Sequence, residues 1–319
     1  MRRMIIDTDT ASDDAVALLM ALLDPAVQVE AITTVCGNMP LDLATINALA
    51  TVQVAGRETP PVYEGADRPL FRELKTAEMV HGSNGMGDMD LPELTLSPAP
   101  GFAALKIIEL VKQYPGELDL VVLGPATNIA TALLLDPVAM RGVRHIYSMG
   151  TCGFERWGVT PVSEFNVLVD AEAYDIMLRS GIPMTLIGID QCRGEAALDA
   201  EEIAAIEHCG NAVGHFAMRC NYTLIELYTR RAGRKQLGLP DPVAMAAAIW
   251  PELVLDAPAC YCYTCTTEPM TYGQVIINEH QERALFPYPG SGEPPNATVV
   301  REMDYQGFKR KLTELLVNA

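Results

Sequence analysis

The chain has 319 residues, of which 49% are hydrophobic and 20% are charged. This composition is typical of a globular protein with a large buried core. Because 23 Lys and Arg stand against 41 Asp and Glu, for a net charge of −18, nucleic acid and anionic membrane surfaces are unfavourable partners. No apolar run is long enough to span a bilayer or to serve as a secretion signal, so we expect a cytoplasmic protein.

Short β-rich apolar runs alternate with helical patterns along the first two thirds of the chain. The predicted strands are residues 3–7, 27–35, 118–124, 143–150 and 183–190, and the predicted helices are residues 13–24, 41–56 and 128–136. Continuous apolar strands separated by helices predict an α/β fold, with an open, mostly parallel, Rossmann-like sheet flanked by helices. We expect one domain over residues 1–319.

Two regions depart from this alternation. Residues 60–100 are rich in Pro, Gly and Met and predict long loops, whereas the chain becomes β-rich after about residue 250 and ends in a predicted helix, residues 305–319. In sheets of this kind ligands bind at the carboxyl ends of the strands. Polar residues gather at those ends, in the segments DTDTASDD, TTVCGN, VLGPATN, YSMGTCG and IGIDQC.

Four aspartates, Asp7, Asp9, Asp13 and Asp14, fall within eight residues at the end of the first predicted strand. Ser12 is expected to cap the helix that follows, with Asp13 and Asp14 in its first turn, where they complement the helix dipole. The dipole accounts for two carboxylates and leaves the mutual repulsion of four unexplained. A hard divalent cation bound by oxygen ligands, such as Ca²⁺, would remove that repulsion.

Two other chemistries are compatible with parts of the sequence. The aspartate-nucleophile phosphatases have a strand that ends in DxDx(T/V), but here the fifth position is Ala11 and no partner lysine motif follows. The eight cysteines are scattered, which indicates reduced thiols. The run CYCYTC at 260–265 alternates at strand spacing and could form a metal cluster, although it has no CxxC pair and no neighbouring histidine.

Several sequence blocks resemble one family, the inosine–uridine-preferring nucleoside hydrolases. The N-terminal fingerprint DxDxxxDDAxA is present from Asp7 to Ala17, with Thr10-Ala11 in place of the usual Pro-Gly. Further blocks follow in the family's order: ITTVCGN, HGSNGMGD, GPATNIA, MGTCG, SEFNVLVDAEA and DPVAMA. Together they cover about residues 4–250.

The resemblance implies a Ca²⁺ at the bottom of a pocket. Its implied ligands are Asp9, Asp14, Asp241 and the backbone carbonyl of Leu123, while Asp7 orients its neighbours. The residues implied to bind the ribonucleoside substrate are Asp13, Asn38, His81, Met149, Trp157, Glu164, Asn166 and Asp241. Before the resemblance is considered, Asn38 is equally well explained as a turn residue, and Glu164 and Asn166 as two side chains on one face of an extended segment.

The implied reaction is hydrolysis of the N-glycosidic bond, through a transition state that resembles an oxocarbenium ion. Asp9 is expected to act as the general base, and Asn166 to stabilise positive charge on the sugar ring. Pro240 replaces a family histidine before Asp241, and Gly158 replaces a family asparagine that holds the 5′-hydroxyl. Tyr228 is then a candidate to contact or protonate the departing nucleobase, and Trp157 is a candidate to stack on that nucleobase. Packing roles are the alternative for both.

These two departures keep a second function open, that of a ribonucleoside-binding or sensor protein that retains the metal site but not efficient hydrolysis. The expected partners are the small-molecule ribonucleoside and, by resemblance to the family, further copies of the chain in a homodimer or homotetramer.

Overall fold

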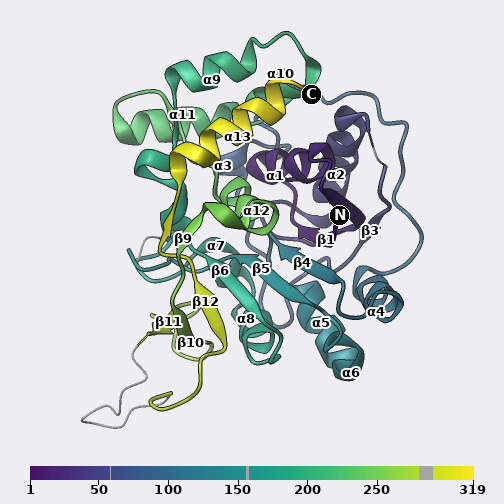
Figure 1. Ribbon diagram of the computed structural model, residues 1–319, viewed down its shortest axis with the longest axis vertical. Coiled ribbons are helices and arrows are strands. Elements are labelled where there is room, and N and C mark those ends of the chain that lie inside the picture. The colour runs from purple at the N-terminus through teal and green to yellow at the C-terminus, as the bar shows by residue number, and fades with distance from the viewer. Residues whose placement is uncertain (58, 156–157, 280–289) are drawn as a thin grey trace.

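A nine-stranded sheet runs through the centre of the protein, with helices on both of its faces (Figure 1). The structure is a computed structural model that describes residues 1–57, 59–155, 158–279 and 290–319. In spatial order the strands are β11 (Val275–Asn278), β10 (Ala259–Thr264), β12 (Ala297–Val299), β6 (Met184–Ile187), β5 (His145–Met149), β4 (Leu118–Val122), β1 (Arg2–Thr8), β2 (Val27–Thr34) and β3 (Val62–Glu64).

The sheet is mostly parallel, as predicted. All neighbours from β3 to β12 pair in parallel, whereas β10 is antiparallel to both β12 and β11. The chain thus adds an antiparallel edge to a doubly covered parallel sheet, which explains why the sequence pattern changes after residue 250.

The two faces of the sheet carry separate hydrophobic cores. One core includes residues from α1 (Ser12–Leu23), α2 (Leu41–Ala55), α9 (Ala200–Glu207), α10 (Ala212–Arg219), α11 (Tyr222–Ala232), α12 (Pro240–Ile249) and α13 (Tyr305–Val317). The other includes residues from α4 (Ala103–Gln113), α5 (Thr127–Leu135), α6 (Pro137–Met140) and α8 (Ala171–Leu178). The short helices α3 (Glu78–His81) and α7 (Phe165–Val169) complete the α-helices of the described residues.

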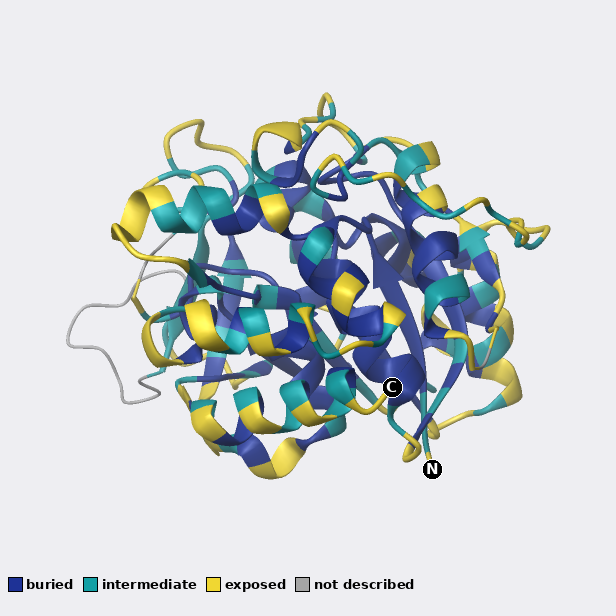
Figure 2. Ribbon diagram, turned by 90° about the horizontal axis from the view of Figure 1, so that it is seen from above, coloured by how far each residue is buried: buried dark blue, intermediate teal, exposed yellow. Residues whose placement is uncertain are grey.

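Strand periodicity distributes the side chains between these two cores. Met4 and Ile6 of β1 pack on the α1 face, and Ile5 between them packs on the opposite face. This alternation is the period of two expected of a strand. Because both faces are covered, the strands are buried while the helices expose their outer sides (Figure 2).

The predicted elements of the first 190 residues are all present, but the sequence pattern predicted no element between residues 198 and 239. There the structure has α9, α10 and α11, together with a small sheet of β7 (Leu198–Asp199) and β8 (Gln236–Leu237). A second small sheet pairs β9 (Val254–Asp256) with β13 (Glu302–Met303). Short 3-10 helices span Ile189–Cys192, Gly194–Ala196 and Pro251–Leu253.

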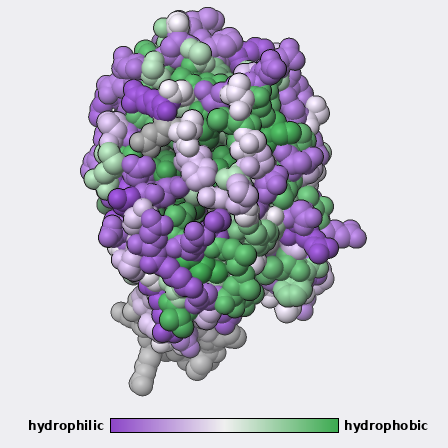
Figure 3. Space-filling model, turned by 90° about the vertical axis from the view of Figure 1, so that its right-hand side faces the viewer, coloured by the Kyte–Doolittle hydropathy of each residue, from purple (hydrophilic) through white to green (hydrophobic). Residues whose placement is uncertain are grey.

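The surface mixes polar and apolar side chains. Figure 3 shows one face on which hydrophilic residues lie around patches of hydrophobic ones. Large apolar side chains that are more than half exposed include Leu134, Leu135 and Val138, where α5 ends and α6 begins. Within the described part of the chain, no helix is both long enough and apolar enough to cross a membrane.

Candidate active site

The acidic segment lies where β1 ends and α1 begins. Thr8 ends the strand, Asp9 follows it, and the helix begins at Ser12 with Ala11 at its N-cap. The expectation that Ser12 caps the helix is therefore wrong. Instead, the Ser12 hydroxyl lies 2.7 Å from His81 Nδ1, and the backbone N–H of Ala11 donates to Asp14 Oδ2 at 3.0 Å.

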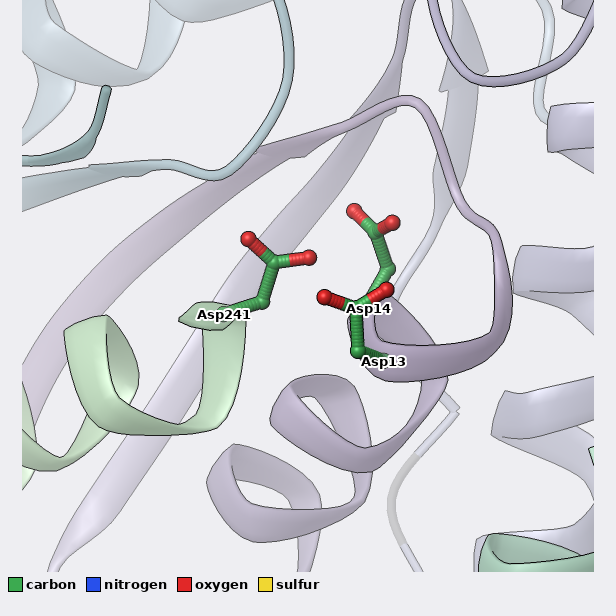
Figure 4. Close-up of side chains that lie close together, drawn as sticks. All are labelled: Asp13, Asp14 and Asp241. Carbon is green, nitrogen blue, oxygen red and sulfur yellow. The ribbon is translucent and has the colours of Figure 1, made fainter. Parts of the chain in front are cut away.

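Three carboxylates from two distant segments meet at this point. Asp13 and Asp14 lie in the first turn of α1, and Asp241 lies in the first turn of α12. One oxygen of each carboxylate lies within 4.8 Å of the others, and all three residues are buried. Figure 4 shows the three side chains projecting from the two helix starts toward a shared space. Each helix N-terminus contributes a positive dipole end that favours negative charge there.

Asp9 is held next to this group by close backbone packing. Its Oδ2 accepts a hydrogen bond from the backbone N–H of Asn38. A Cβ built on Gly37 would overlap Asp9 Oδ2, and one on Gly124 would lie 2.8 Å from Asp9 Oδ1. Neither glycine has a positive φ, so the absence of a side chain, rather than a special backbone angle, is what makes room for the carboxylate.

Asp7 is buried at the end of β1 and is held by hydrogen bonds from neighbouring elements. Its Oδ1 accepts hydrogen bonds from Thr33 Oγ1 at 2.5 Å and from Asn128 Nδ2 at 2.8 Å. Asn128 Nδ2 also donates to the backbone carbonyl of Thr34 at 3.0 Å. The network therefore ties the ends of β1 and β2 to the start of α5.

Burial and mutual repulsion make these carboxylates reluctant to ionise. Burial raises the pKa of Asp7 to about 7, and the pKa values of Asp13 and Asp14 to about 6. For Asp14 the charge of Asp13 is the second cause. The pKa values of Asp9 and Asp241 are raised well above 3.8, first by burial and then by the charge of Asp14. A cation among them would reverse these shifts.

The donor set fits a hard divalent cation. Carboxylate oxygens are the ligands that Ca²⁺ and Mg²⁺ prefer. Among the described residues, Oδ1 of Asp9 and Oδ1 of Asp13 are buried without a hydrogen-bond partner, a costly arrangement unless another group satisfies them. The geometry groups Asp13 with Asp14 and Asp241. The family resemblance instead implied that Asp9, Asp14 and Asp241 bind the ion and that Asp13 binds the sugar.

The Leu123 carbonyl, the fourth implied ligand, is linked to Asn166. Asn166 Nδ2 donates to Leu123 O at 2.5 Å and to Met149 O at 3.3 Å. Leu123 follows β4 and Met149 ends β5, so this amide connects the carboxyl ends of two adjacent strands. A carbonyl oxygen has a second lone pair, and the bond from Asn166 leaves it available for a cation.

A cavity of about 310 Å³ opens over the acidic cluster. The structure brings most of the predicted substrate residues to its lining, namely Asp13, Asn38, His81, Met149, Glu164, Asn166, Tyr228 and Asp241. Gly158 and Pro240, the two departures from the family pattern, line it as well. Trp157 lies outside the described residues. Asp9 and Asp14 are fully buried and are not part of the lining.

His81 and Glu164 are both buried and both perturbed. Burial lowers the pKa of His81 to about 4, so its imidazole is neutral at pH 7. Glu164 is the N-cap of α7, where it accepts from the N–H of Val167 at 3.2 Å, and burial raises its pKa to about 7. Both side chains therefore belong to the inner wall of the cavity, where neither carries its usual charge readily.

The two departures have distinct structural consequences. Pro240 is the first residue of α12, where proline is well tolerated because its missing N–H would be unpaired in any residue. A Cβ on Gly158 would overlap the backbone oxygen of Ser163. An asparagine therefore cannot replace Gly158 in this backbone without displacing the segment around Ser163.

Sequence reasoning missed part of the cavity wall. The residues that it did not identify include Arg193, Arg231, Leu224, Leu227 and Ile189. Arg193 comes directly after the strand-end segment IGIDQC, and that position was the available signal. The helix α11, which carries the leucines and Arg231, was not predicted at all.

The cysteine run does not form a second metal site in the described chain. Cys260 and Cys262 are buried in β10, and Cys265 follows that strand. The acidic trio is the grouping of metal-ligating side chains found there. All eight cysteines are free thiols, as the scattered spacing indicated.

The raised pKa values predict a pH-dependent stability for protein stripped of divalent ions. Asp7, Asp13 and Asp14 bind protons more tightly in the folded protein than in the unfolded chain, where their pKa is the ordinary 3.8. Their protonation therefore stabilises the fold below about pH 4, and this stabilisation is lost as pH rises through the folded values of about 6 to 7. We expect the Tm of chelator-treated protein to fall from pH 5 to pH 8 and to recover on addition of Ca²⁺. A Tm that rises over this interval and ignores Ca²⁺ would contradict the expectation.

Comparison with known proteins gives a consistent result. The family model for inosine-uridine preferring nucleoside hydrolases matches residues 4–310. Pyrimidine-specific ribonucleoside hydrolase RihA from Shewanella sp. strain ANA-3 is 34% identical over 321 residues, which cover 99% of this chain and 96% of the relative. The pyrimidine-specific ribonucleoside hydrolase RihA of Photobacterium profundum is 33% identical over 318 residues and covers 99% of both chains.

Solved structures agree with the sequence relatives. A plant nucleoside hydrolase aligns with a TM-score of 0.93 and 30% identity, covering 100% of this chain and 99% of its own. A purine-preferring ribonucleoside hydrolase from Gardnerella vaginalis aligns with a TM-score of 0.90 and 27% identity, covering 99% and 98%. The chain therefore belongs to the inosine-uridine preferring nucleoside hydrolase family, whose members are hydrolases that act on N-glycosyl compounds.

Proposed function

We propose that this chain is a calcium-dependent N-ribohydrolase that cleaves ribonucleosides to ribose and free base. The observation that carries the proposal is the buried trio Asp13, Asp14 and Asp241, with oxygens within 4.8 Å of one another below a cavity of about 310 Å³. A cavity of this size accepts a small molecule of nucleoside dimensions. The acidic end of the cavity accounts for both the cation and the sugar hydroxyls.

The ion would be held by Asp9, Asp14, Asp241 and the Leu123 carbonyl, with Asp13 grouped beside Asp14 and Asp241. Calcium at this position supplies positive charge that acidifies a neighbouring water and attracts the vicinal hydroxyls of the ribose. Calcium is favoured over transition metals because every donor is an oxygen, and the cluster has neither histidine nor cysteine among its three members.

The chain's own residues would then carry the hydrolysis. Asp9 Oδ2 is fixed by the Asn38 N–H while its Oδ1 has no partner among the described residues, so Oδ1 is available to take a proton from the attacking water. Glu164 and Asn166 line the same cavity and would stabilise the positive charge that grows on the ribose ring. Asn38 and Asp13 would bind sugar hydroxyls.

A ribonucleoside-binding or sensor protein is the second candidate. Pro240 has no proton to donate at the position before Asp241, and burial keeps the pKa of the Tyr228 hydroxyl well above 10. Neither group is a good acid for protonating a leaving base, which favours slow turnover of natural nucleosides. The complete set of carboxylates and amides around the cavity favours hydrolysis.

We also propose that the chain acts in the cytoplasm and forms a homodimer or homotetramer. The free thiols suit a reducing compartment, and the exposed Leu134, Leu135 and Val138 offer apolar surface to a second copy. Light scattering coupled to gel filtration should give a mass of two or four chains. A single-chain mass at working concentration would contradict the assembly.

A panel of three ribosides separates the two functions. We expect the holoenzyme to release ribose from inosine, from uridine or from both, and from 4-nitrophenyl riboside, whose leaving group needs no acid. Cleavage of the nitrophenyl compound alone would show an intact sugar site with weak leaving-group activation. Binding of ribose-like ligands without cleavage of any compound would refute the hydrolase and support the sensor.

Replacing Asp9 tests its role as the base. We expect Asp9→Asn to retain Ca²⁺ binding by calorimetry and to lose nearly all turnover, because the amide cannot accept the proton. Asp241→Ala is the matched contrast, since it removes an ion ligand and should weaken both Ca²⁺ and substrate binding. Normal turnover in Asp9→Asn would refute the assigned role.

A further inference from the structure

Ser12 lies among the acidic residues and has no part in the hydrolysis proposed above. It is the first residue of α1, directly before Asp13, and it is completely buried. Its hydroxyl lies 2.7 Å from Nδ1 of His81, a residue 69 positions further along the chain. His81 lines the cavity, and its Nδ1 is 3.6 Å from Asp13 Oδ1. The contact between Ser12 and His81 therefore connects the acidic segment to a residue of the cavity wall.

A closed series of hydrogen bonds holds His81 at this position. The backbone N–H of Asn38 donates to Asp9 Oδ2, and the Asn38 carbonyl accepts from the backbone N–H of Ala77 at 2.8 Å. Ala77 is the N-cap of α3, and its carbonyl accepts from the backbone N–H of His81 at 3.1 Å. The contact with Ser12 completes the series. His81 is thus tied through its backbone to Asp9 and through its ring to the start of α1.

The backbone of Ser12 is held on its other side by the junction of α10 and α11. The Ser12 carbonyl accepts hydrogen bonds from Asn221 Nδ2 at 2.9 Å and from Cys220 Sγ at 3.4 Å. Asn221 is completely buried, and its Nδ2 also donates to the carbonyl of Ala217 at 2.8 Å. The hydroxyl of Ser12 and the ring of His81 therefore belong to two segments that are each fixed independently.

The number of available protons assigns the direction of the bond between Ser12 and His81. A serine hydroxyl has one proton to donate, and a neutral imidazole has one N–H. Within the part of the chain that the structure describes, His81 Nδ1 is the partner found for the Ser12 hydroxyl. If Nδ1 carried the ring proton, the hydroxyl proton would be buried without an acceptor, which is costly. Nδ1 is therefore the acceptor, and the ring proton is on Nε2.

The imidazole of His81 is neutral in this setting. Burial lowers its pKa to about 4, and a cation held by the nearby carboxylates would disfavour ring protonation further. Nε2 has no hydrogen-bond partner among the residues that the structure describes. Its N–H is thus left to bind a ligand in the cavity that His81 lines.

We infer that Ser12 is a positioning residue for His81, whose hydroxyl keeps the ring proton on Nε2 so that this N–H donates to an acceptor oxygen of the bound ribonucleoside. This inference rests on the proposed function. A ring with its proton on Nδ1 would present a bare lone pair to the same oxygen and repel it. Ser12 thereby determines whether His81 attracts or repels the substrate.

The nitrogen spectrum of the histidine rings tests the tautomer without turnover. The chain has five histidines, and in protein labelled with 15N-histidine and loaded with Ca²⁺ the His81 signals are those lost in His81→Gln. We expect Nδ1 to have the chemical shift of an unprotonated ring nitrogen and Nε2 that of a protonated one. Ser12→Ala should move part of the population to the other tautomer. A proton on Nδ1 in the wild-type protein would overturn the inference, even if Ser12→Ala failed to fold.

Kinetic variants test the consequence for the substrate. Ser12→Ala should lower kcat/KM for the best-cleaved riboside about ten-fold, the loss expected when one hydrogen bond is removed, and should leave the affinity for Ca²⁺ by calorimetry unchanged. Ser12→Thr keeps the hydroxyl and should retain most of the activity. His81→Gln keeps an N–H donor in the place of Nε2 but has no Nδ1, so adding Ser12→Ala to it should cause no further loss.

Ser83→Ala is the matched control. Ser83 lies in the same glycine-rich segment as His81 but is exposed, and its hydroxyl bonds Asp88 Oδ1 at 2.7 Å. The backbone N–H of Ser83 bonds the same oxygen at 2.6 Å and is kept in the variant. We therefore expect the kcat/KM of Ser83→Ala to equal that of the wild-type enzyme.

The remaining outcomes separate this inference from the proposed function. Equal losses from Ser12→Ala in the wild-type and His81→Gln backgrounds, or a weakened affinity for Ca²⁺, would show that Ser12 acts through the ion site and would overturn the inference. Unchanged kcat/KM in Ser12→Ala would also overturn it. If the wild-type enzyme cleaved no riboside of the panel, the proposed function would be refuted and with it the role toward the substrate, whereas the assignment of the tautomer would still be decided by the spectra.

Discussion

The repulsion among buried carboxylates is the constraint on which the site depends. Asp9, Asp13, Asp14 and Asp241 all lie away from solvent, and burial raises the pKa of each. Such an arrangement costs stability in a metal-free protein. The helix starts of α1 and α12 and the hydrogen bonds around Asp7 hold the groups in place, and a bound cation would convert the repulsion into attraction.

The fold explains why these residues meet. Parallel strands place their carboxyl ends along one edge, so the segments after β1, β2, β4 and β5 converge there. Asn166 links the ends of β4 and β5, while Asp7 and Asn128 link β1, β2 and α5. Helix α12 adds Asp241 from far along the chain. The acidic floor is thus built on the centre of the sheet, and α11 and residues 189–193 contribute to the rest of the cavity lining.

The sequence predicted the sheet and the floor of the cavity better than the wall. The strands that carry Asp7 and Met149, and the strand that precedes Leu123, are continuous apolar runs, and their pattern is clear because both faces of the sheet are buried. Residues 198–239 fold into short helices that pack against α13 and α2 as well as against one another, so their pattern depends on contacts that no local window contains. The Ser12 prediction failed for a similar reason, since His81, distant in sequence, competes for its hydroxyl.

Gly37 and Gly124 enclose the carboxylate of Asp9 with ordinary backbone angles. Because these two glycines leave room for the oxygens of Asp9, the position of the carboxylate depends on the course of the loops after β2 and β4. Substitution of either glycine, even by alanine, would displace the Asp9 carboxylate, because the added methyl group would overlap it. The orientation of the buried Asp9 side chain is thus determined by the loops that follow two central strands of the sheet.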